Sequence, residues 1–130
     1  MEVDSENKTY VLVDCNNMPK AFQTACELAS PTVIVEGFAG PEYNGYVPQY
    51  TQHAKLTRAK HRLKDMTKVV IVIHAVRTVF EAQSAKTVRF IIVTKDKGGQ
   101  AIEQGLKDVN IIAKLINTDG EDLATLLQNL

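Results

Sequence analysis

The chain has 130 residues, of which 45% are hydrophobic, so it can form one hydrophobic core and one domain over residues 1–130. Lysine and arginine together number 15, as do aspartate and glutamate, so no global charge attracts the chain to nucleic acid or to an anionic membrane. The longest apolar run, Val69 to Ile73, is too short to span a bilayer, and the acidic segment 1–8 is expected to be a flexible N-terminus rather than a signal peptide.

The first predicted strand covers residues 10–14, a short apolar run rich in β-branched residues. A helix follows, because Pro19 suits the first helical position and apolar residues then recur at three- and four-residue spacing up to Ser30. Residues 32–36 predict the second strand. The segment Gly37 to Tyr50 is rich in tyrosine, glycine and proline, and is expected to be an ordered surface loop or a partner-binding surface.

The middle of the chain predicts a helix, a strand and a weaker helix. Thr51 can cap the first of these helices, whose apolar stripe consists of Leu56, Ala59, Leu63 and Met66. Residues 68–74 are mostly valine and isoleucine and predict the third strand, and a weaker helical pattern covers residues 78–86. Cationic side chains flank the predicted stripe and form a local basic ridge of Lys55, Arg58, Lys60, Arg62, Lys64 and Lys68.

Residues 89–94 predict the fourth strand, and a helix that begins at Gly99 follows it. Residues 109–116 predict the fifth strand. The last predicted helix places four leucines on one face, Leu123, Leu126, Leu127 and Leu130. The acidic residues in its first turn suit the positive end of the helix dipole.

This alternation of strands and helices predicts right-handed crossovers and a three-layer α/β sandwich with a mostly parallel sheet of about five strands. Nearly continuous apolar strands support the parallel arrangement, since both of their faces are then covered. Ligands bind such a sheet beyond the carboxyl ends of its strands. The acidic residues expected at that edge are Asp14, Glu36, Asp96 and Asp119.

The segments VLVDCNNM and IIVTKDKGGQAIEQGL resemble the NYN group of the PIN-like nuclease superfamily. In that group an apolar strand ends in aspartate with asparagine three residues later, and a later strand runs into a turn that carries acidic metal ligands. Asp14, Asn17 and Asp96 match these positions. The resemblance implies a PIN-like fold with neighbouring first and fourth strands. It also implies that Asp14 and Asp96 hold Mg²⁺ or Mn²⁺ for RNA hydrolysis, while Asn17 orients a ligand or water.

The chain departs from the family pattern directly after Asp96. The family carries a second acidic residue there, whereas this chain has a lysine and two glycines at residues 97–99. Mg²⁺ loses its water reluctantly and needs carboxylate charge, so lysine beside Asp96 opposes a metal site unless Glu36 or Asp119 completes it. The sequence therefore favours an inactive, binding-only relative over a working metal-dependent ribonuclease.

The candidate residues also have structural interpretations. Asn16 or Asn17 is a natural cap for the following helix, and Asp96 suits an ordinary strand-to-helix turn. For Asp14 a functional role is favoured, because a carboxylate that ends a buried strand is costly to desolvate without a partner. His74, placed on the third predicted strand, is expected to be a satisfied core or edge histidine rather than a metal ligand.

The basic ridge suits contact with RNA phosphates, and Tyr46 and Tyr50 just before it suit stacking on bases or a protein interface. A solvated helix face is the structural alternative. The favoured function is a non-catalytic PIN-like module that binds RNA or an RNA-handling protein complex, in the assembly or RNA packaging of a ribonucleoprotein or viral particle. The capsid assembly and packaging protein of double-stranded RNA bacteriophages would suit this description.

Two alternatives remain beside this function. One is a Mg²⁺- or Mn²⁺-dependent ribonuclease that uses Asp14 and Asp96. The other is a structural homo-oligomer, in which the tyrosine-containing loop or an exposed apolar face associates across a two-fold axis. In each case the expected location is the cytoplasm or the inside of a virus particle, with no membrane insertion.

Overall fold

A computed structural model describes residues 7–49, 53–60, 66–82, 88–117 and 121–128, and within them five parallel strands form one sheet in the order β3-β2-β1-β4-β5. The elements in chain order are β1 (Lys8–Asp14), α1 (Pro19–Glu27), β2 (Val33–Ala39), β3 (Ala54–Arg58), α2 (Met66–Ala82), β4 (Val88–Val93), α3 (Gly98–Asp108), β5 (Ile112–Ile116) and α4 (Glu121–Gln128). The predicted three-layer α/β sandwich is confirmed, and the sheet is parallel throughout. Segment 1–8, the expected flexible N-terminus, lies outside the described residues up to residue 6, and Lys8 already belongs to β1.

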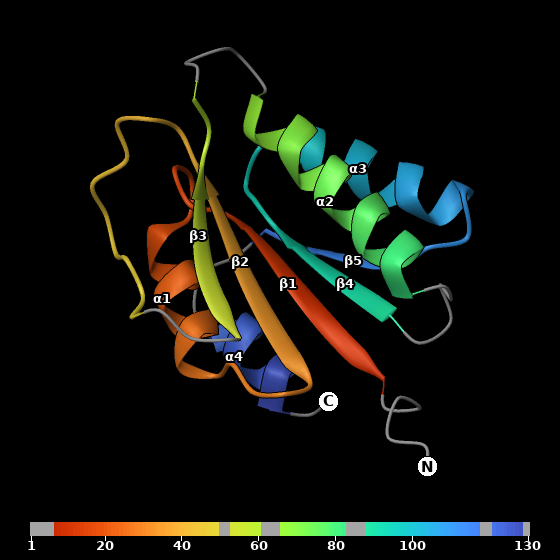
Figure 1. Cartoon of the computed structure of the whole chain (residues 1–130), viewed down its shortest axis with the longest axis horizontal. Coiled ribbons are helices and arrows are strands. Elements are labelled where there is room, and N and C mark those ends of the chain that lie inside the picture. The colour runs from red at the N-terminus through yellow and green to blue at the C-terminus, as the bar shows by residue number, and fades with distance from the viewer. Residues whose placement is uncertain (1–6, 50–52, 61–65, 83–87, 118–120, 129–130) are drawn as a thin grey trace.

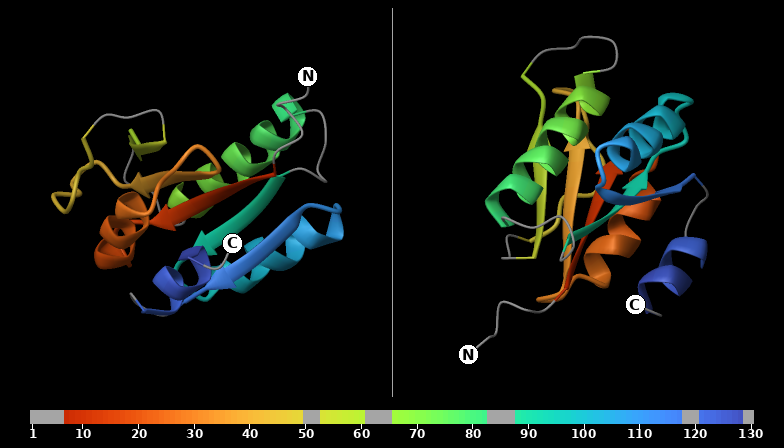
Figure 2. Two further views of the ribbon diagram at one scale, coloured as in Figure 1. Left: turned by 90° about the horizontal axis from the view of Figure 1, so that it is seen from below. Right: turned by 90° about the vertical axis from the view of Figure 1, so that its right-hand side faces the viewer.

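Helices cover both faces of the sheet (Figures 1 and 2). The α1 and α4 helices lie on one face and pack on a core that contains Val11 and Val13. The α2 and α3 helices lie on the other face, over a core that contains Leu12, Phe38 and Phe90. Successive residues of β1 therefore point to opposite cores, which explains why its sequence is apolar without alternation. None of the described helices is long and apolar enough to cross a membrane.

The α1 helix begins at Pro19 as predicted, but neither asparagine caps it. Met18 occupies the cap position, and no side chain there bonds to the free amides of the first turn. The helix buries Phe22 closely against β2, where Gly37 leaves the necessary space. A Cβ atom at Gly37 would lie 2.5 Å from Phe22 Cε1 and 2.5 Å from Cys15 Sγ.

The predictions for the middle of the chain are wrong in two elements. Part of the predicted helix from Thr51 is the edge strand β3, and the predicted strand at 68–74 lies within the 17-residue helix α2. The weaker predicted helix at 78–86 coincides with the end of α2 up to Ala82, and its remaining residues lie outside the described part. A short β-branched run fits a buried strand or a buried helix equally well. The helix is required because the chain must cross from β3 to β4 in a parallel sheet.

The second strand is longer than predicted, and this moves one acidic candidate. It runs to Ala39 instead of ending at Glu36, and Glu36 pairs with Leu12 in the middle of the sheet. Asp14 pairs with Phe38, two residues nearer the carboxyl edge. Glu36 therefore does not lie at the edge where ligands bind such sheets.

A candidate acidic site at the carboxyl edge of the sheet

The first and fourth strands are neighbours, as the sequence resemblance implied, with Val13 paired to Val93. The residues that follow these two strands therefore meet at the carboxyl edge of the sheet. Asp14 ends β1, while Thr94 and Asp96 follow β4. Asp14 shares a face of the sheet with Leu12, which is the face covered by α2 and α3.

Asp14 is a buried carboxylate that is satisfied from within the chain. It is 3% exposed, and its Oδ2 atom accepts hydrogen bonds from Asn17 Nδ2 at 2.5 Å and from Thr94 Oγ1 at 2.9 Å. The amides of Asn17 and Met18 donate to the Asp14 carbonyl, and this turn brings the Asn17 side chain back to the carboxylate. Two donors offset the cost of burying the charge.

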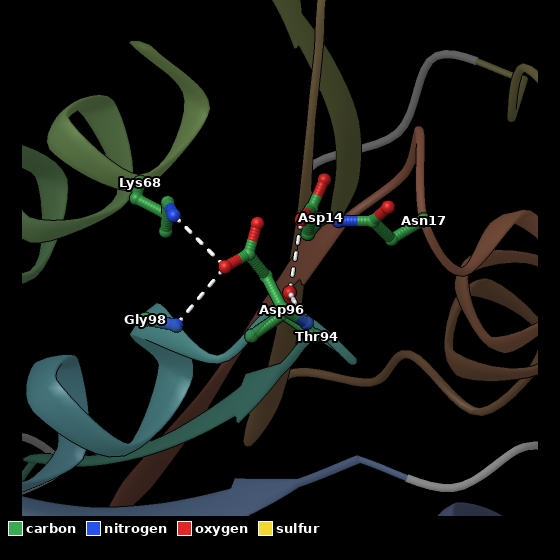
Figure 3. Close-up of polar contacts among 6 residues, drawn as sticks. All are labelled: Asp14, Asn17, Lys68, Thr94, Asp96 and Gly98. Atoms are coloured by element: carbon green, nitrogen blue, oxygen red, sulfur yellow. Dashed lines mark hydrogen bonds and ion pairs between the residues drawn. The ribbon is translucent and has the colours of Figure 1, made fainter. Parts of the chain in front are cut away.

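Asp96 lies beside Asp14 but has different partners (Figure 3). Its Oδ1 atom accepts hydrogen bonds from Lys68 Nζ at 2.9 Å and from the Gly98 amide at 3.0 Å. Its own amide donates to Thr94 Oγ1 at 3.1 Å. The Thr94 hydroxyl thus donates to one acid and accepts from the backbone of the other, which links the ends of β1 and β4.

The turn after β4 explains the conformation of Asp96. The Gly98 amide donates to its carboxylate and the Gly99 amide donates to its carbonyl, so Asp96 organises the start of α3. The structural interpretation of Asp96 is confirmed. The side chain nevertheless remains 37% exposed beside Lys68, so it still borders solvent at the edge of the sheet.

Lys68 was predicted as part of the basic ridge, but its place at this acidic site was not predicted. It lies in the first turn of α2, its side chain is 19% exposed, and it pairs with Asp96 across 28 residues of sequence. The contact with Asp96 was not predicted because residues 68–74 were expected to form a strand. A strand there does not place Lys68 over the carboxyl edge of the sheet. Thr94 was also missed as a functional residue, although a hydroxyl residue directly after an apolar strand was a signal for it.

Glu36 belongs to a separate cluster. It is 5% exposed, and its Oε2 atom lies 3.1 Å from His74 Nδ1 and 3.5 Å from Lys55 Nζ, neither with hydrogen-bond geometry. These are close contacts of the carboxylate and not hydrogen bonds. The His74 ring also meets Phe38 edge to face at 5.0 Å, so His74 is a packed histidine as predicted, on α2 rather than on a strand.

The acids do not form a complete ligand set in the described part of the chain. Glu36 lies away from the edge, and Asp119 lies outside the described residues. Among the residues that the structure describes, no group of three or more histidine, cysteine, aspartate and glutamate side chains could hold a metal ion. The proposed metal pair of Asp14 and Asp96 therefore has no third acidic ligand in these ranges.

The predicted basic ridge does not exist as one helical face. Lys55 and Arg58 lie on β3, Lys60 is exposed just after it, and Arg62 and Lys64 lie outside the described residues. Lys55 pairs with Glu36. Arg58 donates to the Tyr43 carbonyl at 2.6 Å and covers the Tyr43 ring at 5.6 Å.

The tyrosine-containing loop is anchored to its own chain. The Tyr46 ring meets Phe22 edge to face at 5.9 Å, and the Tyr46 carbonyl accepts a hydrogen bond from the Tyr43 hydroxyl at 2.8 Å. Burial raises the pKa of Tyr43 and of Tyr46. Tyr46 therefore packs in part on α1, and Tyr50 lies outside the described residues.

Comparison with known proteins adds no further constraint on this site. The chain matches no protein family model, and no similar protein was found among curated sequences or among solved structures. The contacts of the side chains therefore carry the functional conclusion.

Proposed function

We propose that this chain is a non-catalytic, PIN-like module that works through protein contacts in an assembly. Its acidic edge holds the first and fourth strands together rather than a metal ion. The observation that carries this proposal is the 2.9 Å ion pair between Lys68 and Asp96. The meeting of Asp14, Asn17 and Asp96 at one edge supports the PIN-like part of the proposal.

Lys68 opposes a metal in two ways. Its ammonium group already neutralises Asp96, so only part of the carboxylate charge remains for a cation. It also repels a divalent cation, by about 8 kcal/mol at 4 Å and an effective dielectric constant of 20. Asp14 is similarly engaged with Asn17 and Thr94. Mg²⁺ keeps several waters and is held through one or two carboxylates, so the internal donors on both acids weaken this arrangement as a site for it.

Protein contact is favoured over RNA contact because several candidate RNA-binding side chains already contact other residues of this chain. Lys55 is paired with a buried acid, Arg58 covers a tyrosine of its own chain, and Tyr46 packs on Phe22. The chain as a whole carries no net charge. Tight RNA binding normally requires several cations free to contact phosphates.

One observation favours the alternative of a Mg²⁺- or Mn²⁺-dependent ribonuclease. Asp14 and Asp96 lie at the same edge and share the Thr94 hydroxyl. A cation could reach both acids if the Lys68 ammonium moved away from Asp96. The two functions therefore differ in one testable property, which is the effect of Lys68 on metal binding.

Calorimetric titration with Mn²⁺ tests the proposal, with Lys68→Asp as the variant and Lys107→Asp as the control. Lys107 lies at the far end of α3 and carries the same charge change away from the site. We expect no Mn²⁺ binding by the natural chain or by Lys107→Asp, and measurable binding by Lys68→Asp. Failure of Lys68→Asp to bind would show that the lysine is not what excludes the metal.

Cleavage assays decide between the two functions. The natural chain is expected to leave single-stranded RNA intact in the presence of Mn²⁺. Cleavage that requires Mn²⁺ and disappears in Asp14→Asn would instead establish the ribonuclease and refute the proposal. Circular dichroism spectra of each variant show whether the fold is retained.

A further inference from the structure

The outer side of α2 carries a row of exposed apolar side chains, here named the α2 stripe. Its members are Val69, Ile73, Val76 and Phe80, which are 51%, 49%, 48% and 83% exposed. Ile71 and Ala75, on the opposite side of the helix, are fully buried against the sheet. In Figures 1 and 2 no element of the described chain lies over the outer side of α2.

The composition of α2 indicates that its outer side, like its inner side, packs against another structure. A surface helix of a monomeric protein normally carries polar residues on its outer face, whereas a helix that is apolar all round is buried. Valine and isoleucine are also poorer helix formers than the polar residues commonly found on exposed faces. Exposed, contiguous apolar surface of this kind marks an interaction site.

The spacing of the α2 stripe indicates that its partner is a helix. The four residues are separated by four, three and four positions, which is the spacing of two heptads in a coiled-coil seam. The stripe itself contains no cationic side chain that could contact a phosphate. A helix laid along it would bury each member in turn, which RNA would not.

The same spacing fits a second copy of this chain. Because four, three, four reads identically in both directions, an antiparallel α2 helix presents a matching stripe. We propose that α2 pairs with α2 of a second copy across a two-fold axis that passes midway between Ile73 and Val76. Val69 then faces Phe80 of the second copy, and Ile73 faces Val76. Each layer combines a larger with a smaller side chain, and each contact occurs twice, as a two-fold interface requires.

Charge supports a second copy as the partner. Between Val69 and Phe80 the ionisable residues are His74 and Arg77, and His74 faces Glu36 of its own chain. Arg77 flanks the stripe and would lie over Val70 of the second copy, where its aliphatic stem can cover apolar surface. Coiled coils choose different partners through charges at the flanking positions, and this seam offers little such discrimination. The zero net charge of the chain also removes repulsion between copies.

The size of the contact predicts a reversible dimer. The stripe extends over eleven residue steps, or about 16 Å of helix. A seam of this length buries less surface than a standard interface, which buries about 800 Å² on each partner. We therefore expect a dimer that forms and dissociates with concentration. This inference rests on the proposed function, because it names the partner of the proposed protein contact.

Sedimentation velocity over a series of protein concentrations tests the dimer, with Ile73→Glu and Phe80→Glu as the variants. The Ile73 side chain is 49% exposed and the Phe80 side chain 83%, so the substitutions leave the buried core intact. Val109→Glu is the matched control, since Val109 is 61% exposed but lies after α3. The natural chain and Val109→Glu should dimerise with rising concentration, while the two stripe variants should remain monomeric.

Cross-linking tests the orientation. Val69→Cys and Phe80→Cys chains, mixed and oxidised, should form a disulfide-linked dimer of one of each, because these positions face each other in the antiparallel pair. Neither variant alone should link through the stripe, since its own two positions would lie about 16 Å apart. Peptide mapping identifies which cysteines are joined. It distinguishes the expected link from one that involves the natural cysteines, of which Cys15 is buried and Cys26 half-buried.

Three outcomes would overturn the inference. They are a strictly monomeric natural chain at every concentration, a dimer that both stripe variants retain, and linkage of Val69→Cys to itself, which indicates parallel helices. None of them affects the metal titration, so the proposed non-catalytic role is judged separately. Conversely, Mn²⁺-dependent cleavage would refute the proposed role while leaving the dimer to be decided by sedimentation.

Discussion

Thr94 is a neutral residue on which two charged residues depend. It is fully buried, and its one hydroxyl group serves the Asp14 carboxylate and the Asp96 amide at once. Its methyl group lies close to Gly99, where an added Cβ would be 2.7 Å from Thr94 Cγ2. The residue therefore contributes both a hydrogen-bonded link and packing at the edge of the sheet.

Replacing Thr94 by valine should destabilise the fold by about 2 kcal/mol, because it removes a donor from a buried carboxylate and an acceptor from an amide while conserving volume. Thr94→Ser is the control, since it keeps the hydroxyl and loses one methyl group, worth about 0.8 kcal/mol. Urea unfolding curves measure both changes. A Thr94→Val variant as stable as Thr94→Ser would contradict the proposed link.

The two thiols should be unreactive in the folded chain. Burial raises the pKa of the Cys15 thiol strongly and that of the Cys26 thiol to about 12, from an ordinary value of 9.0. Since the folded pKa is the higher one, the resulting stabilisation is complete below pH 9 and is lost as the pH rises from about 9 toward 12.

Iodoacetamide labelling followed by mass spectrometry checks this expectation. At pH 8 both cysteines should be alkylated much more slowly in the folded chain than in urea, since the thiolate is the reactive form. Rapid labelling of Cys26 in the folded chain would show that its thiol is not protected.

At the scale of the elements, two glycines illustrate how differently a helix and a strand tolerate added volume. Gly37 in β2 lies against Phe22 and Cys15, whereas a Cβ at Gly105 on the exposed side of α3 would meet nothing within 4 Å. Gly37→Ala should cost about 1–3 kcal/mol through overpacking. Gly105→Ala should instead stabilise the chain by about 0.5–1 kcal/mol, because glycine is a poor helix former.

Thermal unfolding of the two glycine variants provides the comparison. The Tm of Gly37→Ala should fall below that of the natural chain, and the Tm of Gly105→Ala should rise above it. An unchanged Tm for Gly37→Ala would mean that α1 can move away from β2 without cost, contrary to its close packing there.

The edge strand β5 is partly protected against pairing with another sheet. The Leu115 amide donates to Glu103 Oε2 of α3 at 2.7 Å, so this amide is already occupied. Lys107 also pairs with Glu103 from the next turn of α3, at 3.6 Å. An occupied amide opposes the pairing of another strand with β5 at this position.

At the scale of the whole molecule, charge balance predicts weak RNA binding. Fluorescence anisotropy with single-stranded RNA should show binding only at low salt, because the 15 cationic side chains of the chain are balanced by 15 acidic ones. Lys60→Ala, which changes an exposed lysine after β3, should reduce this residual binding further. Tight binding at physiological salt that Lys60→Ala weakens would favour the RNA-binding alternative over protein contact.

Local sequence patterns predicted the contacts of the site that join residues close together along the chain. Asp14 and Asn17 are three residues apart, and their contact follows from the turn between them. By contrast, Thr94 reaches Asp14 across 80 residues and Lys68 reaches Asp96 across 28. No local pattern encodes such contacts, since they depend on which strands become neighbours.

By itself, hydrophobic patterning determined the layered α/β architecture, the parallel sheet and the elements with clear ends, such as the helix that begins at Pro19. Only the tertiary structure decided that residues 68–74 are helical, that Lys68 neutralises Asp96, and that an exposed apolar stripe runs along α2, made of Val69, Ile73, Val76 and Phe80. The physical reason is that a β-branched apolar run satisfies a strand and a buried helix alike. Its conformation is settled by the crossover from one edge of the sheet to the other side of β1.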